Sequence, residues 1–388
     1  MNRINRYTKK AHLLLIILSL FVFRLVAAQE VELAGEIVYS SALEIISTQN
    51  IQRMSCLINL PFQDAAQHLA WSPSGDILAV ATLQELWLYD ARNLNQPPQM
   101  IADGFDVLGE VVFSPDETQI AVVTTNFAGA VNYLSDPAAI RIFDLETNAQ
   151  VQVLITDEFS ADIAFLKNSH QLVSVDGTDY QIHVWDLTNG IEITQIDTAV
   201  LGFPLMLDAD FSLQQSIYAL ATGAQVNTIE GWGVESGERL WETPYGYAAA
   251  ISFSQDGSLL YGASRYGGSG LIWDVHNREV LHTLDFVNRW VAAADFSADA
   301  RMFAQIEENP FGDANAKLEI RFWDVERGEN LFVRSISETL SEAPDFPLTS
   351  SIQLGFSPDG KLLAIGDPAN GLTLWGILTQ TDGERSCP

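Results

Sequence analysis

The stretch GFSPDGKLLAIGDPANGLTLWG, residues Gly355–Gly376, contains the pattern that decides the fold. The aromatic residue Phe356 is followed by the polar turn Ser-Pro-Asp-Gly and then by an apolar run. A second apolar run ends at Leu374-Trp375-Gly376. Short apolar runs on both sides of such turn residues are typical of β-strands joined by a tight connection. The stretch therefore predicts neighbouring strands of an antiparallel sheet.

The same pattern occurs seven times along the chain, always with an aromatic residue first and an apolar residue eighth. The copies are WSPSGDILA from Trp71, FSPDETQIA from Phe113, FLKNSHQLV from Phe165, FSLQQSIYA from Phe211, FSQDGSLLY from Phe253, FSADARMFA from Phe296 and FSPDGKLLA from Phe356. Successive copies begin 42 to 60 residues apart. A repeat of this length holds about four short strands with turns between them.

Each copy is followed by a second aromatic residue, and in five copies Asp comes directly after it. These residues are Tyr89, Phe143, Trp185, Trp232, Trp273, Trp323 and Trp375. With its FSPDG-type turns and Trp-Asp pairs, the chain resembles the degenerate WD40-repeat proteins that are common among exported bacterial proteins. The resemblance covers roughly Asn50 to Cys387. It implies an all-β fold, a seven-bladed β-propeller whose blades are four-stranded antiparallel sheets.

The chain also departs from the family pattern. The Gly-His pair that precedes the first strand in the family is absent, and the buried network of His, Ser/Thr, Asp and Trp survives only in part. The third copy comes nearest, with Ser174, Asp179 and Trp185. Lost hydrogen bonds weaken single blades, so we expect apolar packing between blades to supply more of the stability. Four of the tryptophans are therefore expected in the core rather than in a ligand site, namely Trp185, Trp273, Trp323 and Trp375.

The resemblance also predicts how the ring closes. The last copy supplies three strands, the third of which ends near Leu372 to Leu378, and the stretch Ser55–Leu60 would supply the fourth from the other end of the chain. The chain contains two cysteines, Cys56 in that stretch and Cys387 after the last strand. An even number of cysteines in an exported protein suggests a disulfide. We expect this pair to lock the closure, and two unpaired thiols are the alternative.

The amino-terminal residues 1–28 read as a secretory signal peptide, because a basic segment precedes an apolar run and then the small residues Ala27 and Ala28. Arg24 interrupts the apolar run, which disfavours the alternative of a retained membrane anchor. The expected location is therefore secreted, periplasmic or in the cell envelope. Residues 29–49 would be a linker or an external arm, and Ile51 to Met54 a short helical turn. Residues 50–388 would form the propeller.

The composition restricts the partners. The chain has 50 acidic and 20 basic residues, and five of the basic residues lie in the predicted signal peptide. An acidic surface repels phosphate, so nucleic acid is excluded as a partner, and anionic membranes are disfavoured. The apolar fraction of 47% suffices for a large core. We expect a monomer whose charge serves solubility.

The connections of variable length predict a binding face. The FSPDG-type turns are equal in length, whereas long connections at Thr124 to Pro137, Glu307 to Lys317 and Arg334 to Ser350 would all lie on the opposite face. Long loops often carry binding, although they can also be tolerated without a function. The candidate contacts are aromatic and acidic residues of this face: Phe127, Tyr133, Asp136, Tyr245, Tyr247, Tyr266, Glu307, Glu308, Phe311, Asp313 and Phe346.

The sequence provides no motif for catalysis. There is no Gly-x-Ser-x-Gly motif, and the histidines have no metal-ligand spacing, so we expect neither an enzyme, nor a metal, nor a cofactor. The expected function is a non-enzymatic scaffold that binds a protein. The alternatives are a glycan or cell-surface binding module, which needs an exposed aromatic platform, and an enzyme, which needs carboxylates or histidines clustered at the central funnel.

Overall fold

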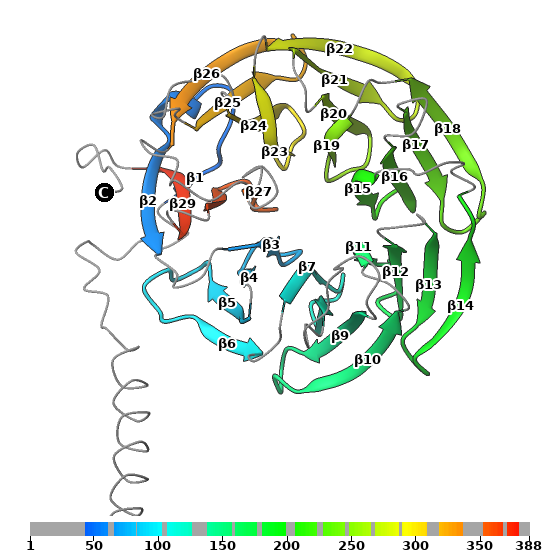
Figure 1. Ribbon diagram of the computed structural model, residues 1–388. Coiled ribbons are helices and arrows are strands. Elements are labelled where there is room, and N and C mark those ends of the chain that lie inside the picture. Colours follow the sequence, from blue (N-terminus) through cyan, green and yellow to red (C-terminus); the bar gives the residue numbers. More distant parts are fainter. Residues whose placement is uncertain are drawn as a thin grey trace, which may run out of the picture. The chain divides into compact units, whose positions relative to one another are not determined.

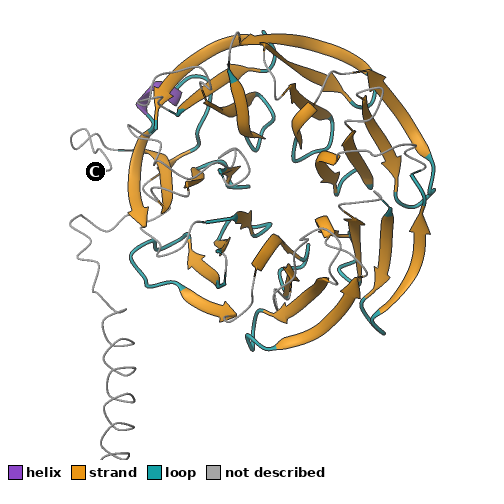
Figure 2. Ribbon diagram, viewed as in Figure 1, coloured by secondary structure: helices purple, strands orange, loops and turns teal. Residues whose placement is uncertain are grey.

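A computed structural model describes residues 43–60, 66–82, 84–102, 107–125, 138–156, 160–176, 181–198, 206–222, 228–244, 248–264, 268–286, 289–308, 318–336, 352–367 and 371–379. These residues form seven antiparallel sheets arranged in a ring (Figure 1). Almost all of the regular structure is β-strand, as Figure 2 shows. The predicted fold class, a seven-bladed β-propeller, is confirmed.

Each of the first six blades contains four strands in chain order from the centre of the ring to its rim. Blade 1 has β3 His68–Trp71, β4 Ile77–Ala81, β5 Leu86–Asp90 and β6 Gln99–Ala102. Blade 2 has β7 Val107–Phe113, β8 Gln119–Thr125, β9 Ala138–Asp144 and β10 Gln150–Thr156. Blade 3 has β11 Ser160–Phe165, β12 Gln171–Asp176, β13 Ile182–Asp186 and β14 Ile191–Ile196.

The following blades repeat this arrangement. Blade 4 has β15 Met206–Ser212, β16 Ile217–Thr222, β17 Thr228–Gly233 and β18 Arg239–Pro244. Blade 5 has β19 Ala248–Phe253, β20 Leu259–Ser264, β21 Gly268–Asp274 and β22 Glu279–Phe286. Blade 6 has β23 Trp290–Phe296, β24 Met302–Glu308, β25 Glu319–Asp324 and β26 Glu329–Ser335. Blade 7 has β27 Gln353–Phe356, β28 Leu362–Asp367 and β29 Gly371–Leu378.

The repeated FSPDG-type sequence makes the turn between the first and second strand of each blade. In the last blade the Ser357 hydroxyl donates to Asp359 at 2.7 Å and accepts the Leu362 amide at 2.9 Å. The Asp359 carboxylate also accepts the amide of Lys361. Gly360 has a φ of 72°, a left-handed conformation that glycine adopts without strain. The repeat is therefore a self-contained hydrogen-bonded turn that fixes the strand register.

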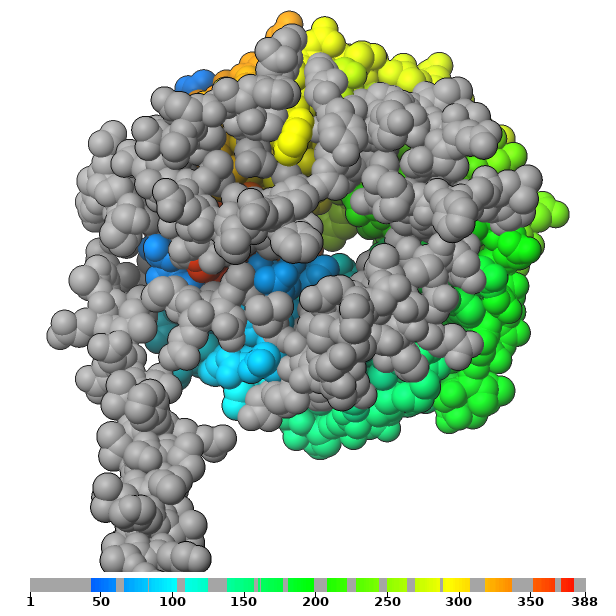
Figure 3. Space-filling view, viewed as in Figure 1, coloured from blue at the N-terminus to red at the C-terminus, as the bar shows by residue number. Residues whose placement is uncertain are grey.

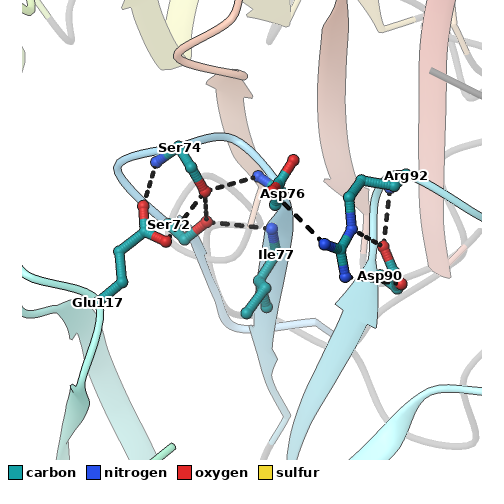
Figure 4. A network of polar contacts seen from close by, with 7 residues as sticks. All are labelled: Ser72, Ser74, Asp76, Ile77, Asp90, Arg92 and Glu117. Carbon is teal, nitrogen blue, oxygen red and sulfur yellow. Dashed lines mark hydrogen bonds and ion pairs between the residues drawn. The ribbon is translucent and has the colours of Figure 1, made fainter. Parts of the chain in front are cut away.

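Blade 1 shows a variant of this turn in which Ser74 replaces the Asp (Figure 4). The Ser74 hydroxyl accepts the Asp76 amide at 3.2 Å, and Ser72 accepts the Ile77 amide at 3.0 Å. The Glu117 carboxylate from the turn of blade 2 accepts the amide and hydroxyl of Ser74. Neighbouring turns thus bond to one another across the blade boundary.

Apolar packing joins the blades, as the sequence predicts. The described residues contain seven buried apolar clusters, and each lies between two adjacent blades. The four tryptophans expected in the core, Trp185, Trp273, Trp323 and Trp375, are all at most 8% exposed. A single blade has two apolar faces, and only neighbours on both sides bury them.

The family's polar network survives in part, also as predicted. The Trp185 indole N–H donates to the Ser174 hydroxyl at 3.0 Å, whereas the indole nitrogens of Trp273 and Trp323 are buried without a hydrogen-bond partner. Asp179, the third residue of the predicted network, lies outside the described residues. In the same blade, His183 forms hydrogen bonds with Asp176 at 3.0 Å and with Glu192 at 2.9 Å, so a histidine and an aspartate are again part of a polar network.

An amino-terminal strand closes the ring. Strand β2, Ser55–Leu60, pairs antiparallel with β29, so that Cys56 lies opposite Trp375 (Figure 1, blue beside red). The predicted closure is confirmed. Strand β1, Leu43–Glu44, also pairs with β29, and the 3₁₀ helix η2, Ile51–Arg53, forms the predicted helical turn.

The described residues of the predicted external arm belong to the last blade. Leu43 and Ile46 are buried at 6% and 2% exposure, because they pack on the closing sheet. Arg53 forms an ion pair with Glu44 at 2.9 Å and donates a hydrogen bond to the Leu378 carbonyl at 3.0 Å, which joins this segment to β29. No helix within the described ranges is both long and apolar enough to cross a membrane.

The disulfide between Cys56 and Cys387 remains a prediction, because Cys387 lies outside the described residues. Cys56 is 3% exposed, beside the last strand of the chain. We expect the oxidised protein to resist alkylation until it is reduced, and reduction to lower the free energy of unfolding by about 2–4 kcal/mol. Intact-mass analysis after alkylation with and without reductant measures the pairing. Two thiols that react in the purified, unreduced protein would contradict it.

Candidate functional site: an acidic central cavity

The innermost strands of the blades surround a cavity of about 580 Å³ at the centre of the ring. Six ionisable residues line it, and five of them are acidic: His68, Glu110, Asp162, Asp208, Asp210 and Asp295. No lysine or arginine is among the described lining residues. The described lining of the cavity is thus rich in carboxyl groups.

Four of these residues come from one repeated sequence position. The third residue before the first aromatic of each copy lies in the inner strand and lines the cavity. In blade order the residues at this position are His68, Glu110, Asp162, Asp208, Ala250, Ala293 and Gln353. We call the first four the acidic arc. The sequence contains this signal three residues before each first aromatic, but the predicted binding residues did not include the arc.

Three aspartates of the cavity connect neighbouring blades. The Asp208 carboxylate accepts the Ile251 amide of blade 5 at 2.7 Å and the Ala209 amide of its own strand at 3.1 Å. Asp210 accepts a hydrogen bond from the amide of Phe253 at 2.6 Å, and Asp295 accepts one from the amide of Phe356 at 2.7 Å. Each of the three thus uses both oxygens on backbone donors, so their main role is structural.

Burial dominates the electrostatics of these aspartates. It raises the pKa of Asp208 to about 8, and the nearby Asp210 carboxylate adds to the rise, although the Ile251 amide opposes it. Burial likewise raises the pKa values of Asp210 and Asp295 to about 7, against the opposing effect of their amide donors. Burial therefore favours the protonated forms of these carboxyl groups in the folded state.

Asp162 differs from the other three. Burial and the charges of Glu110, Asp210 and Asp208 raise its pKa well above the usual range. Its Oδ2 atom is buried and has no hydrogen-bond partner. Next to it in the arc, Glu110 Oε2 lies 2.8 Å from His68 Nδ1. The arc therefore combines one close His–Glu pair with one carboxyl group that has an unpaired oxygen.

These shifts predict a stability that falls as the pH rises. The pKa of Asp208 is about 8 in the folded protein against an ordinary 3.8. The contribution of its protonated form to the free energy of unfolding is therefore complete below pH 3.8 and is lost as the pH rises through 8. Asp210 and Asp295 act in the same direction. Burial opposes the charge of His183, but its bonds to Asp176 and Glu192 raise its pKa to about 9, so its contribution is also lost at high pH.

We accordingly expect the thermal midpoint to be higher at pH 5 than at pH 8, by about 5 °C or more. Calorimetry at constant ionic strength measures it. Asp208→Asn serves as the control, because its amide resembles the protonated carboxyl and should flatten the pH dependence. A midpoint that rises from pH 5 to pH 8 would contradict the prediction.

Most residues predicted to form the binding face lie outside the described residues. They are Phe127, Tyr133, Asp136, Tyr245, Tyr247, Tyr266, Phe311, Asp313 and Phe346. Glu308 ends β24, and its side chain is likewise outside the description. Their role therefore stays a prediction.

Glu307 is described, and it is not on a loop. It lies in β24 with 0% exposure, and its carboxylate accepts two hydrogen bonds from Arg321 at 2.7 and 3.1 Å. The Gln305 side-chain amide donates a hydrogen bond to the same carboxylate at 2.6 Å. Its oxygen accepts a hydrogen bond from the hydroxyl of Tyr261 in blade 5 at 2.5 Å. Glu307 thus belongs to a buried network between blades 5 and 6, and this burial leaves it no exposed surface for a partner.

The two faces of the disc differ in their connections. On one face, neighbouring turns of equal length are joined by hydrogen bonds. Ser74 donates to Glu117 (Figure 4), and Lys167 donates to the Gln214 carbonyl at 2.7 Å. The connections at residues 126–137, 309–317 and 337–351 start from the opposite face, because they follow second or fourth strands. Between the faces, the described strands form the rim in chain order (Figure 3).

Comparison with known protein families and curated sequences does not identify a relative of this chain. The chain matches no model of a known protein family, and no curated protein sequence matches it. The seven-bladed ring agrees with the resemblance to WD40-repeat proteins, which rests on the sequence motifs. The fold defines the protein as a β-propeller.

Proposed function

We propose that this propeller is an exported, non-enzymatic scaffold that binds a protein partner through the face with the long connections. The observation that carries the proposal is the contrast between the two faces. On the turn face, hydrogen bonds between neighbours such as Asp116 and Ser169 hold short turns of constant length. On the other face the lengths vary from blade to blade, as is common where loops carry recognition.

The position of the acidic cavity also supports binding at the face with the long connections. The inner strands begin on the long-connection side and end at the turns, and the acidic arc lies nearer to their beginning than the aromatic residues do. A partner seated on this face would therefore meet the carboxyl groups of the arc at the centre of its footprint. A cationic group of the partner would favour the charged form of these carboxyl groups.

The test is recovery of a partner from the cell-envelope fraction, followed by a binding measurement with the purified partner. The variant shortens residues 309–317, which leaves Glu307 and Arg321 in place. We expect this variant to lose binding, and the control Lys167→Ala on the turn face to keep it. Equal binding by the intact protein and the shortened variant would contradict the role of this connection, and loss with Lys167→Ala alone would assign binding to the turn face.

An enzyme acting at the cavity is the second candidate function. The observation in its favour is the clustering of His68, Glu110 and Asp162 at the centre of the ring. A carboxyl group whose pKa is raised can donate a proton near neutral pH. Turnover of nitrophenyl esters or glycosides that Asp162→Asn abolishes would favour this candidate over the scaffold. We expect no turnover.

A further inference from the structure

A second hollow, which shares no described lining residue with the central cavity, lies between blades 4 and 5. Its residues come from the turn after the first strand of each blade, from the β21–β22 turn and from the start of β18, so it lies on the turn face. Its volume is about 320 Å³, near the lower end of the range for small-molecule pockets. We call it the blade 4–5 groove.

The described lining of the groove combines an apolar wall with two basic residues. Ile217, Trp241 and Val275 in the wall are 8%, 7% and 6% exposed. His276 and Arg278 are exposed residues of the β21–β22 turn. No aspartate or glutamate is among the described lining residues, although the chain has 50 acidic and only 20 basic residues. The charge of Arg278 is thus opposite in sign to the net charge of the chain.

The two basic residues are a departure of blade 5 from its neighbours. In blades 2 to 6, the fifth residue after the second aromatic has a positive φ, and in chain order these residues are Asn148, Gly190, Gly237, Arg278 and Gly328. The third residue after the same aromatic is acidic or neutral in the other four blades, where it is Glu146, Thr188, Glu235 or Glu326, but in blade 5 it is His276. Blade 5 therefore carries basic side chains at two positions where these blades have none.

Arg278 occupies a backbone position that does not suit it. Its φ of 58° is a left-handed conformation, which costs stability for a residue with a large side chain and none for the glycine of blades 3, 4 and 6. Within the described part of the chain, the Arg278 side chain makes no hydrogen bond or ion pair that would offset this cost. Strained positions of this kind are often kept for function. The guanidinium of Arg278 is therefore available to a ligand.

The aspartates of the two blade 5 turns beside the groove are already engaged. Asp256 accepts hydrogen bonds from the hydroxyls of Ser254 and Ser258, both at 2.7 Å. Asp274 accepts hydrogen bonds from the backbone and side-chain amides of Asn277 at 2.7 and 3.0 Å. These carboxylates stabilise their own turns, which agrees with the absence of a described ion pair to Arg278.

The charge and the shape of the groove restrict the chemistry of its ligand. The planar guanidinium of an arginine matches the two oxygens of a carboxylate. An apolar wall favours a ligand with a hydrocarbon body, because burial removes that body from water. A dianion such as phosphate would be repelled by the net charge of −30, which one arginine does not balance, whereas a single carboxylate is repelled less.

We propose that the blade 4–5 groove binds an organic carboxylate with an apolar body, and that Arg278 is the partner of the carboxylate. His276 offers a second N–H donor in the same turn, and the hydrocarbon body packs on the apolar wall. The ligand is either a small free acid or the carboxyl terminus of a peptide. The groove lies on the face opposite to the one that the proposed function uses, so this inference stands if that function fails.

The experiment measures binding by calorimetry at neutral pH and low ionic strength, since salt screens exposed charges. The probes are 3-phenylpropionate and the tripeptide acetyl-Gly-Gly-Phe with a free carboxyl group. The controls are the amides of both probes and sodium phosphate. Binding of either carboxylate in preference to its amide supports the proposal, and the tighter of the two probes identifies the source. Equal binding of a carboxylate and its amide, phosphate binding at least as tight, or no binding of either carboxylate overturns it.

Two variants make the result specific. Arg278→Gly restores the residue of three other blades, so it should keep the thermal midpoint to within about 3 °C while weakening carboxylate binding about tenfold or more. Arg327→Gln is the matched control, because it removes an arginine from the corresponding turn of blade 6, where Arg327 pairs with Asp324 at 2.7 Å. The control should bind the carboxylates normally. Unchanged affinity in Arg278→Gly, or an equal loss in Arg327→Gln, overturns the assignment.

Discussion

Replacing Arg321 with Leu is expected to lower the free energy of unfolding by about 3–5 kcal/mol. The reason is the 0% exposure of Glu307, whose carboxylate accepts two hydrogen bonds from the Arg321 guanidinium. Without the arginine, a buried charge remains with the Gln305 amide as its described donor. Urea denaturation monitored by tryptophan fluorescence measures the loss.

The double variant Glu307→Gln/Arg321→Leu separates the lost interaction from the stranded charge. It should recover most of the stability, because the penalty in the single variant arises mainly from the unpaired carboxylate. Arg289→Leu is a control at a more accessible pair, since Arg289 and Glu319 are 24% and 27% exposed and 3.0 Å apart. It should cost at most about 1 kcal/mol. A single variant as stable as the control would refute the role of the network.

Removing the closing strand is expected to abolish cooperative folding. A variant that begins at residue 61 lacks β2 and with it the buried residues Ile51, Met54 and Cys56, each at most 3% exposed. Burial of one large apolar side chain contributes about 1.5–3 kcal/mol, so the combined loss approaches the whole stability of a typical domain. The unpaired edge of β29 would also promote aggregation.

The matched control begins at residue 43 and keeps β1, η2 and β2. Near-ultraviolet circular dichroism and calorimetry compare the two variants. We expect a single sharp unfolding transition for the longer variant and none for the shorter one. A shorter variant that unfolds at the same temperature would show that the six other blades and the three remaining strands are sufficient.

The aligned aromatic residues were enough to predict the number of blades, and the family resemblance predicted the closing strand. This worked because each copy contains its own turn, in which residues such as Ser357 and Asp359 bond within one short segment. Local chemistry of this kind can be read from consecutive residues. The burial of Trp185 and Trp375 followed from the same periodicity.

The cavity could not be predicted in the same way, because it depends on contacts between blades. Nothing in the sequence around Asp208 shows that its carboxylate reaches the Ile251 amide in the next repeat. Glu307 was assigned to a loop because it stands at the edge of a polar segment, but strand β24 continues to Glu308. Its partner Arg321 is on the neighbouring strand, across a connection whose length hides their proximity.

The closure by β2 has a consequence for how the protein is made. The strand is synthesised before any blade, yet its partner β29 follows roughly 300 residues later, so β2 must wait unpaired while the other blades assemble. At translation rates of about 5–20 residues per second, that interval lasts at least about 15 seconds. A chaperone that shields the leading segment would therefore matter more to this protein than to one whose neighbouring strands are also neighbours in sequence.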